Sequence, residues 1–271
     1  MTLHPNSLQE ENGETELPNR NTIQSISRAM DILQAFPVLG PEVSITSLAN
    51  HLGLNKATVC RILATLETQG FITHTTEGRR YRLGVSLFEL GAYYQSQLDV
   101  RRQALPFLQA LSAKVNETAF LCVRDGNFVL CVERVDVQKD FEHFALRVGG
   151  RLPLHCGAAP RIILSEFEDQ EIVRYAEQTG LPPTTPRSIT TLDKLMEDVM
   201  KTRRLGYVLS DEDVTPGISS IGAPVRDYSG EVVAAISVSG MAGFFRDHLT
   251  ELAQEVKRTA MLISENMGYR N

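Results

Sequence analysis

Small and basic side chains recur at spacings that would let them contact a nucleic acid. Lys56, Thr58 and Arg61 follow one another along a short segment, and basic residues return at Arg79 and Arg80. An arginine can read a base edge in the DNA major groove, whereas lysines and hydroxyls bind backbone phosphates. The expected chemistry is non-covalent recognition of double-stranded DNA by Asn55, Lys56, Thr58, Arg61, Arg79 and Arg80.

Two short helices joined by a tight turn are expected to position these side chains. Leu48, Ala49 and Leu52 share one side of the first helix. Gly53 follows where a helix often ends with positive φ, and Asn55 then supplies an N-cap for the second helix. The second helix has its own apolar side, formed by Val59, Ile62, Leu63 and Leu66. The opposite side of that helix suits a DNA major groove and carries Lys56, Ala57, Thr58, Arg61, Ala64 and Thr65.

A further helix is expected to precede this pair, within residues 22–39. Pro37 and Pro41 mark its end. Its apolar face is expected to complete a three-helix core through Ile26, Ala29, Met30, Leu33 and Phe36.

A β-hairpin is expected directly after the three helices. Residues 71–74 and 81–83 alternate as strands, and Glu-Gly-Arg-Arg forms the turn at 77–80. Such a hairpin is a wing, which brings Arg79 and Arg80 to backbone phosphates or to the adjacent minor groove. The alternative for the two helices alone is an ordinary αα-hairpin with no DNA-binding role. The basic β-hairpin that follows them favours the DNA-binding interpretation.

Composition supports a soluble DNA-binding protein. A chain of 271 residues permits two domains, and 42% apolar and 22% charged residues are typical of soluble globular proteins. Residues 22–84 hold six Lys/Arg against four Asp/Glu, within a chain of net charge −6. A weakly basic module on an acidic chain favours sequence-selective binding over a general nucleic-acid coat.

The first residues predict a cytoplasmic protein. Residues 1–21 are polar and acidic and lack the apolar stretch of a signal peptide, so we expect a disordered tail. The sequence contains no run of about eighteen apolar residues, so we expect no membrane span.

The cysteines predict free thiols. Cys60, Cys122, Cys131 and Cys156 show no CxxC spacing, and we expect no metal and no cofactor. Cys60 is expected to pack beside the apolar side of its helix. If Asp125-Gly126 is a two-residue turn, Cys122 and Cys131 are diagonal neighbours about 7–8 Å apart, too far for an unstrained disulfide.

The rest of the chain mixes helices and strands. A helix over 85–100, with Leu87, Leu90, Gly91, Tyr94 and Leu98 in one stripe, is either a linker and dimer seam or a cap on the first core. Pro106 is expected to open another helix. Two strands separated by Asp125-Gly126 are expected to form a hairpin within 119–135. Further strands are expected at 141–148, 207–210, 218–225 and 232–240, and helices at 157–167, 168–178, 192–204 and 249–267. The pattern predicts an α+β fold with a mainly antiparallel sheet.

The order of these motifs resembles the IclR family of bacterial transcriptional regulators over residues 22–268. The motifs that carry the resemblance are SISRAMDIL, LANHLGLNKATVCRILATLE, RRYRLG, RLPLH, GISSIGAPV and AAISVSG. It implies an N-terminal winged helix-turn-helix and a C-terminal effector domain similar to GAF domains. It also implies dimers or dimers of dimers, palindromic operators, and small organic acids or aromatic catabolites as effectors. The domains are expected at 1–21 (tail), 22–84 (DNA-binding), 85–104 (linker helix) and 105–271 (effector binding and oligomerisation).

The resemblance also implies an effector pocket. By position, the pocket residues would be Phe141, Phe144, Ala158, Ala159, Ser210, Asp211, Ile218, Ser220, Ser237 and Ser239. Core packing is the alternative role for the two phenylalanines. Solvent exposure is the alternative for the serines that alternate along a strand. The chain departs from the family at Pro160 and Arg161, where many members have Gly-Lys. Pro160 removes one amide from a helix start that would hold a carboxylate, and Arg161 either binds that carboxylate or points to solvent.

The function predicted from these features is ligand-responsive regulation of transcription, with repression of a catabolic operon expected. An activator of the same type, a DNA-binding bifunctional enzyme and a ligand-free architectural protein are the alternatives. We do not expect an enzyme, because no G-x-S-x-G, P-loop or H-E-x-x-H pattern occurs.

Overall fold

The computed structural model describes residues 23–75, 80–97, 99–137 and 146–270. Contacts divide the chain into two compact units, Met1–Gln97 and Leu98–Asn271. Each unit has its own hydrophobic core and is described by itself.

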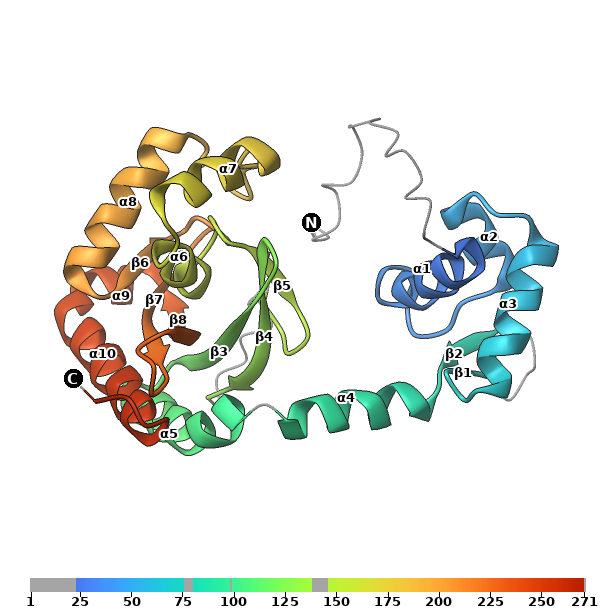
Figure 1. The fold of residues 1–271 in the computed structure, drawn as a ribbon, viewed down its shortest axis with the longest axis horizontal. Helices are drawn as coiled ribbons and strands as arrows, with labels where there is room; N and C mark the ends of the chain where they lie inside the picture. The colour runs from blue at the N-terminus through green and yellow to red at the C-terminus, as the bar shows by residue number, and fades with distance from the viewer. Residues whose placement is uncertain (1–22, 76–79, 98, 138–145, 271) are drawn as a thin grey trace. The chain divides into compact units, whose positions relative to one another are not determined.

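The first unit is a small helical domain with a β-hairpin (Figure 1). Its described elements are α1 (Gln24–Leu39), α2 (Ile45–Leu52), α3 (Lys56–Thr68), β1 (Ile72–His74), β2 (Tyr81–Leu83) and α4 (Val85–Gln97). The strands pair antiparallel, with Thr73 opposite Arg82, which confirms the expected hairpin. An isolated bridge between Val43 and Tyr81 ties the hairpin to the segment before α2.

Local capping sets the α2–α3 pair. The Ser44 hydroxyl accepts a hydrogen bond from the Ser47 amide at the start of α2. Gly53 ends α2 with φ of 64°, a conformation that costs glycine little. Asn55 Oδ1 then accepts the Thr58 amide at 2.7 Å, as the N-cap of α3. The expected turn at Gly53 and the expected cap at Asn55 are confirmed, and the Ser44 cap is an additional finding.

The packing face of α1 matches the expected one in part, because Phe36 is buried in the core and Ala29 and Leu33 pack against it. Ile32, Ala35 and Phe36 are buried against α2 and α3, whereas Ile26 and Met30 are 55% and 46% exposed. The face that packs on the core therefore gains Ile32 and Ala35, which were not expected there, and excludes Ile26 and Met30. Pro37 does not end the helix, because α1 continues to Leu39 and Gly40 caps it.

The second unit is built on one antiparallel sheet. Its described elements are α5 (Asp99–Val115), β3 (Thr118–Asp125), β4 (Phe128–Val135), β5 (Arg151–Pro153), α6 (Ala158–Ser165), α7 (Asp169–Thr179), α8 (Leu192–Leu205), β6 (Val208–Asp211), β7 (Ile218–Arg226), β8 (Val232–Met241), α9 (Ala242–Asp247) and α10 (Leu249–Asn266). Among the described residues the strand order is β5-β4-β3-β8-β7-β6, and neighbouring strands run antiparallel.

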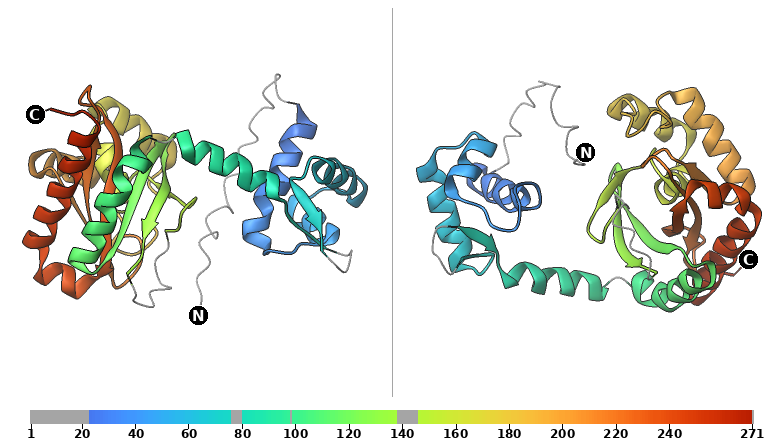
Figure 2. Two further views of the ribbon diagram at one scale, coloured as in Figure 1. Left: turned by 90° about the horizontal axis from the view of Figure 1, so that it is seen from below. Right: turned by 180° about the vertical axis from the view of Figure 1, so that it is seen from behind.

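Helices cover both faces of this sheet, as Figures 1 and 2 show. α5 and α10 lie side by side on one face, where the core includes Ala234, Ile236 and Val238 of β8. α6 lies on the other face, and α7 and α8 follow it around a second core that includes Ala235. The alternation along β8 therefore decides which side chains face α6.

Two expectations are wrong, one for the start of α5 and one for the turn of the β3–β4 hairpin. Pro106 lies inside α5, which begins at Asp99, because the buried stripe of Val100, Ala104 and Leu108 continues across the proline. The packing of that stripe outweighs the cost of an internal proline, about 3 kcal/mol.

The turn between β3 and β4 also differs, since Asp125 and Phe128 pair and the two residues between them form the turn. Together with an irregularity after Leu121, this register places Cys122 directly opposite Cys131 rather than diagonally. Both are free thiols.

Short elements were not expected. β5 pairs with β4 at the sheet edge, and α9 follows β8 directly. The expected strand over 141–148 falls mostly outside the described residues, and residues 146–150 form no strand. In the part of the chain that is described, no helix combines the length and apolar character needed to cross a membrane.

A candidate DNA-binding surface and a candidate ligand cavity

The outer side of α3 presents the side chains that were expected to contact DNA. Lys56, Ala57 and Arg61 are exposed, and Thr58 is half-buried. The buried side of the helix is formed by Val59, Leu63 and Leu66. An exposed face of small and basic residues on a rigid helix can lie against a major groove.

The hairpin adds basic groups beside α3. Arg80 is exposed, and its carbonyl accepts a hydrogen bond from the Thr75 amide. Arg79 lies outside the described residues. Arg82 on β2 is also exposed and was missed, although its place between Tyr81 and Leu83 in an alternating strand could have found it. The wing therefore offers one more cation than expected.

Cys60 does not pack in the core as expected. It is exposed on α3, next to Arg61. The apolar side of the helix is narrow, and position 60 falls just beyond its edge.

A partly open cavity of about 50 Å³ lies in the second unit between β7, β8 and the start of α6. It is lined by Phe120, Leu146, Leu152, Gly157, Ala158, Ala159, Pro160, Ser210, Val214, Thr215, Ile218, Ser220, Ser237 and Ser239. Seven of the ten residues expected at an effector site are in this lining. Phe141 and Phe144 lie outside the described residues.

Serine hydroxyls form the polar side of the cavity. Ser237 and Ser239 are two residues apart on β8 and share the face toward α6. Ser220 of β7 lies directly opposite Ser239. The hydroxyls of these three serines have no hydrogen-bond partner among the described residues. They are therefore available to a bound molecule.

The start of α6 closes the cavity on the opposite side. The amides of Ala158 and Ala159 stand in the first turn, where a helix offers them no internal partner. Pro160 contributes no amide. A side chain on Gly222 of β7 would meet backbone and side-chain atoms of Ala158 at 3.1–3.2 Å. Glycine at that position lets the helix start lie directly on the strand.

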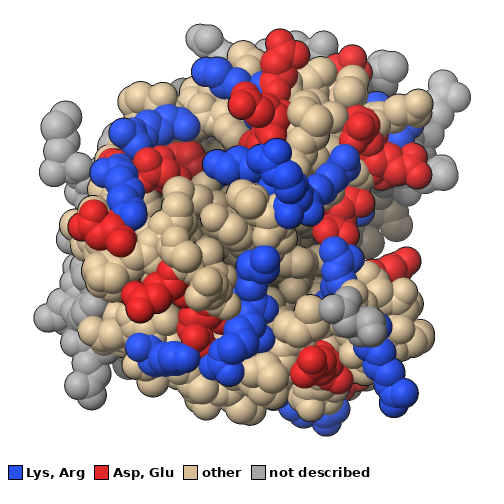
Figure 3. Space-filling model, turned by 90° about the vertical axis from the view of Figure 1, so that its left-hand side faces the viewer, with Lys and Arg blue, Asp and Glu red and all other residues tan. Residues whose placement is uncertain are grey.

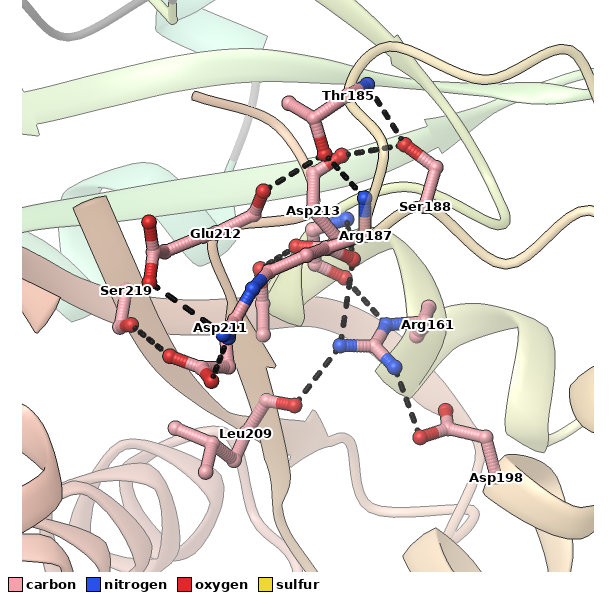
Figure 4. Close-up of polar contacts among 12 residues, drawn as sticks. Arg161, Thr185, Arg187, Ser188, Asp198, Leu209, Asp211, Glu212, Asp213 and Ser219 are labelled. Atoms are coloured by element: carbon pink, nitrogen blue, oxygen red, sulfur yellow. Dashed lines mark hydrogen bonds and ion pairs between the residues drawn. The ribbon is translucent and has the colours of Figure 1, made fainter. Parts of the chain in front are cut away.

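Asp211 does not line the cavity. Consecutive strand residues point to opposite faces, so Ser210 enters the cavity and Asp211 does not. Asp211 instead accepts hydrogen bonds from Ser219 Oγ at 2.7 Å and Arg187 Nη1 at 2.6 Å (Figure 4). Burial acts to raise the pKa of Asp211, but Ser219 and Arg246 outweigh it and the pKa is lowered. The expectation of an effector contact at Asp211 is not supported by this geometry.

Arg161 is buried and is held by the protein itself, so neither of its expected roles applies. Its guanidinium donates to Asp198 Oδ1 at 2.7 Å and to the Leu209 carbonyl at 2.8 Å. Nη2 lies 3.4 Å from Asp213 Oδ2. Figure 4 shows this arginine between the two carboxylates. Burial raises the pKa of Asp198, and the adjacent guanidinium opposes part of that rise.

His155 and Cys156 are buried and precede Gly157 of the cavity lining without lining the cavity themselves. His155 Nδ1 is 2.7 Å from Tyr175 Oη, and Nε2 is 3.1 Å from the Pro182 carbonyl. Burial lowers the pKa of His155 and raises the pKa of Cys156 to about 12. A thiol with such a pKa is not an activated nucleophile. These groups position the loop rather than face a ligand.

A wider depression of about 670 Å³ is a weaker candidate. Its two arginines are already engaged, Arg203 with the Ser165 and Phe167 carbonyls and Arg226 with Glu166. Figure 3 shows acidic and basic groups interspersed over one face of the molecule. Among the described residues no cluster of three His, Cys, Asp or Glu side chains could hold a metal ion.

Comparison with known families decides the identity of the two units. Residues 25–75 match the profile described as the IclR helix-turn-helix domain, and residues 92–265 match that described as the bacterial transcriptional regulator IclR C-terminal domain. The chain belongs to the IclR family. The α+β fold and the DNA-binding helix-turn-helix expected from the sequence are confirmed, and the chain is a transcriptional regulator.

Relatives in the IclR family align with more than nine tenths of the chain. KipR of Bacillus subtilis (strain 168), an HTH-type transcriptional regulator, is 32% identical over 251 residues, 92% of this chain and 99% of its own. XynR of Escherichia coli (strain K12), also an HTH-type transcriptional regulator, is 29% identical over 91% of this chain and 98% of its own. The HTH-type transcriptional repressor AllR of Escherichia coli (strain K12) is 29% identical over 95% of both chains.

Solved IclR structures share the fold. The Thermotoga maritima IclR matches with a TM-score of 0.76 and 26% identity over 92% of this chain and 100% of its own. An IclR homolog from Microbacterium hydrocarbonoxydans, solved in complex with 4-hydroxybenzoate, matches with a TM-score of 0.80 and 23% identity over 90% of this chain and 98% of its own.

Proposed function

We propose that this IclR-family regulator is a cytoplasmic repressor of a catabolic operon that releases its operator when a small organic acid binds the serine-lined cavity. The observation that carries the proposal is a set of serine hydroxyls that have no hydrogen-bond partner within the described part of the chain and that face a partly open, largely apolar cavity. Pockets of this kind, with apolar walls and a few convergent polar groups, are typical of small-molecule sites.

On the DNA side, α3 enters the major groove and the wing contacts the backbone. Arg61 reads a base edge, while Lys56, Thr58 and Asn55 bind phosphates near the start of the helix. Arg80 and Arg79 act from the wing. The exposure of the described members of this set supports the assignment.

On the ligand side, hydrogen-bond donors converge without a cationic side chain among the described lining residues. The amides of Ala158 and Ala159 and the hydroxyls of Ser220, Ser237 and Ser239 hold a carboxylate. The apolar walls accommodate a short carbon skeleton or a ring. The 4-hydroxybenzoate bound by the Microbacterium homolog makes that acid a suitable first probe.

Two copies of the chain bind a palindromic operator. The observation that supports a homodimer is the exposed apolar surface of α4, where Phe88 and Tyr93 are 75% and 65% exposed. Surface of this kind is expected to be covered by another protein surface.

The DNA assignment is tested by Arg61→Ala in the full chain. We expect operator affinity, measured by fluorescence anisotropy on DNA flanking the gene, to fall by about 1–3 kcal/mol. Arg102→Ala is the control, because Arg102 is also an exposed arginine but lies on α5. Equal losses in the two variants would show a non-specific charge effect and contradict the assignment.

The ligand assignment is tested by Ser239→Ala. Operator affinity without acid should stay unchanged, and the concentration of 4-hydroxybenzoate or another active acid that releases half the operator should rise. Ser219→Ala, which removes a buried serine outside the cavity, should leave that concentration unchanged. An acid that binds the protein and raises transcription without releasing DNA would identify an activator instead.

A further inference from the structure

We infer that Ser210 makes the cavity selective for acids that also carry a hydrogen-bond donor, such as a hydroxyl, in preference to the unsubstituted acids. The inference rests on the proposed function, because it names the ligand class of the same cavity. The selectivity depends on the direction of the hydrogen bond between Ser210 and Asp213.

Three serines form a row across neighbouring strands. Ser210 of β6 pairs with Ser220 of β7, and Ser220 pairs with Ser239 of β8. All three line the cavity. Adjacent strands are about 4.8 Å apart, so the row spans roughly 10 Å from Ser210 to Ser239. A compact ligand can reach both ends.

Ser210 differs from the other two because its hydroxyl has a partner. Its Oγ donates to Asp213 Oδ1. Asp213 Oδ2 accepts the Gly157 amide at 3.2 Å and lies 3.4 Å from Arg161 Nη2. The three groups around the Asp213 carboxylate are all donors, so its two oxygens act as hydrogen-bond acceptors. Ser210 must therefore give its single proton to Asp213.

The two ends of the row consequently have opposite polarity. A hydroxyl whose proton is committed offers only lone pairs to a third group. Ser210 thus presents an acceptor to the cavity, whereas Ser220 and Ser239 keep their protons and can donate. The amides of Ala158 and Ala159 add donors. A ligand that satisfies the whole row has an acceptor group for the donor end and a donor group for Ser210.

An acid without a donor leaves the Ser210 oxygen unsatisfied once water is displaced, which weakens binding. A hydroxylated acid replaces that water with a direct hydrogen bond. A neutral hydrogen bond of this kind changes affinity by about three- to tenfold.

The experiment uses the full-length protein and two matched series of acids. The first is butyrate with 2-, 3- and 4-hydroxybutyrate, and the second is benzoate with its three hydroxy isomers. Dissociation constants are measured by calorimetry, and operator release by anisotropy. We expect at least one hydroxylated isomer to bind about three- to tenfold more tightly than its parent acid.

Ser210→Ala should remove this preference, bringing the hydroxylated acid to the affinity of its parent while the parent acid changes less than about twofold. Ser219→Ala is the matched control, because Ser219 is equally buried and also donates to an aspartate, Asp211, but outside the cavity. It should keep the preference. Ser210→Cys provides a second variant of similar volume with a weak acceptor.

The outcomes separate the two proposals. If acids of either series bind the wild-type protein without a hydroxyl preference, or if Ser210→Ala keeps the preference, the role of Ser210 is wrong while the ligand site stands. If no acid of either series binds the wild-type protein, the proposed ligand class fails and this inference fails with it.

Discussion

The cysteine side chains occupy two kinds of environment. Cys60 is exposed on α3, whereas Cys122, Cys131 and Cys156 are buried. The hydrogen bond between the Cys122 and Cys131 side chains and burial raise the pKa of Cys122, and burial raises that of Cys156 to about 12. We therefore predict that a thiol reagent such as Ellman's reagent titrates one thiol rapidly in the native protein at pH 8. All four should react in denaturant, and Cys60→Ser should abolish the rapid phase.

The same thiol reports on DNA contact. Because Cys60 is next to Arg61 on the proposed groove face, operator DNA should slow its modification at least tenfold. Unrelated DNA at the same concentration serves as control. Modification at an undiminished rate in the saturated complex would show that this face of α3 does not meet DNA.

His155 makes stability depend on pH. Burial lowers its pKa in the folded state, and the Pro182 carbonyl opposes that shift only in part. The unfolded histidine, with a pKa of about 6.5, then binds more protons than the folded one. Stability should fall as pH decreases through 6.5, by at most about 1.4 kcal/mol per pH unit from this group.

The measurement is urea unfolding followed by circular dichroism between pH 7.5 and 5.5. His155→Gln should lose that part of the slope. An identical slope in wild type and variant would assign the pH dependence to other groups.

At the scale of elements, Gly222 decides how closely α6 approaches the sheet. An added Cβ would lie 3.1–3.2 Å from the backbone of Ala158 and Ala159. Gly222→Ala should therefore displace the start of α6 and destabilise the second unit by about 1–3 kcal/mol. It should also weaken acid binding, because the donors of α6 move.

Gly243→Ala is the matched control. Gly243 lies in α9 with nothing near an added Cβ, and alanine in a helix stabilises by about 0.4–1 kcal/mol. Urea unfolding compares the two variants. A Gly222→Ala protein as stable as wild type would mean that α6 adjusts freely.

Long elements with a clear period were predictable from the sequence. The buried stripes of α3 and α10 span several turns, and the alternation of β7 and β8 flanks a turn at Asp227–Gly230 that is rich in turn-forming residues. β5 and α9 are three and six residues long. Segments of this length do not complete enough periods to be recognised, and packing of neighbouring elements defines them.

Part of the cavity lining was predictable from the alternation of side chains along a strand. Alternation alone places Ser237 and Ser239 on one face, but it also separates Ser210 from Asp211, which the resemblance had grouped together. The role of Arg161 depends on Asp198 and Asp213. Partners this far along the chain come together only through the fold, so no local pattern reveals them.

At the scale of the whole molecule, the exposed apolar residues on α4 support the proposed homodimer. Phe88 is 75% exposed in the single chain, so Phe88→Ser should cost the folded monomer little. In a symmetric dimer that buries the Phe88 ring, the substitution removes that ring from both protomers at once. Burial of one such side chain contributes about 1.5–3 kcal/mol, so the dimer dissociation constant should rise at least about a hundredfold.

Operator binding should depend on the same dimerisation. A single DNA-binding module with few cations has low affinity for DNA, whereas two modules held in one dimer act at a high effective concentration. The Phe88→Ser protein should bind the operator only at concentrations that restore the dimer, with steeper dependence on protein concentration than wild type. Sedimentation equilibrium and anisotropy measure the two quantities. Tyr228→Ser, a change at an 82% exposed tyrosine in the second unit, is the control and should alter neither. Unchanged mass and operator affinity in Phe88→Ser would place the dimer interface on other surfaces.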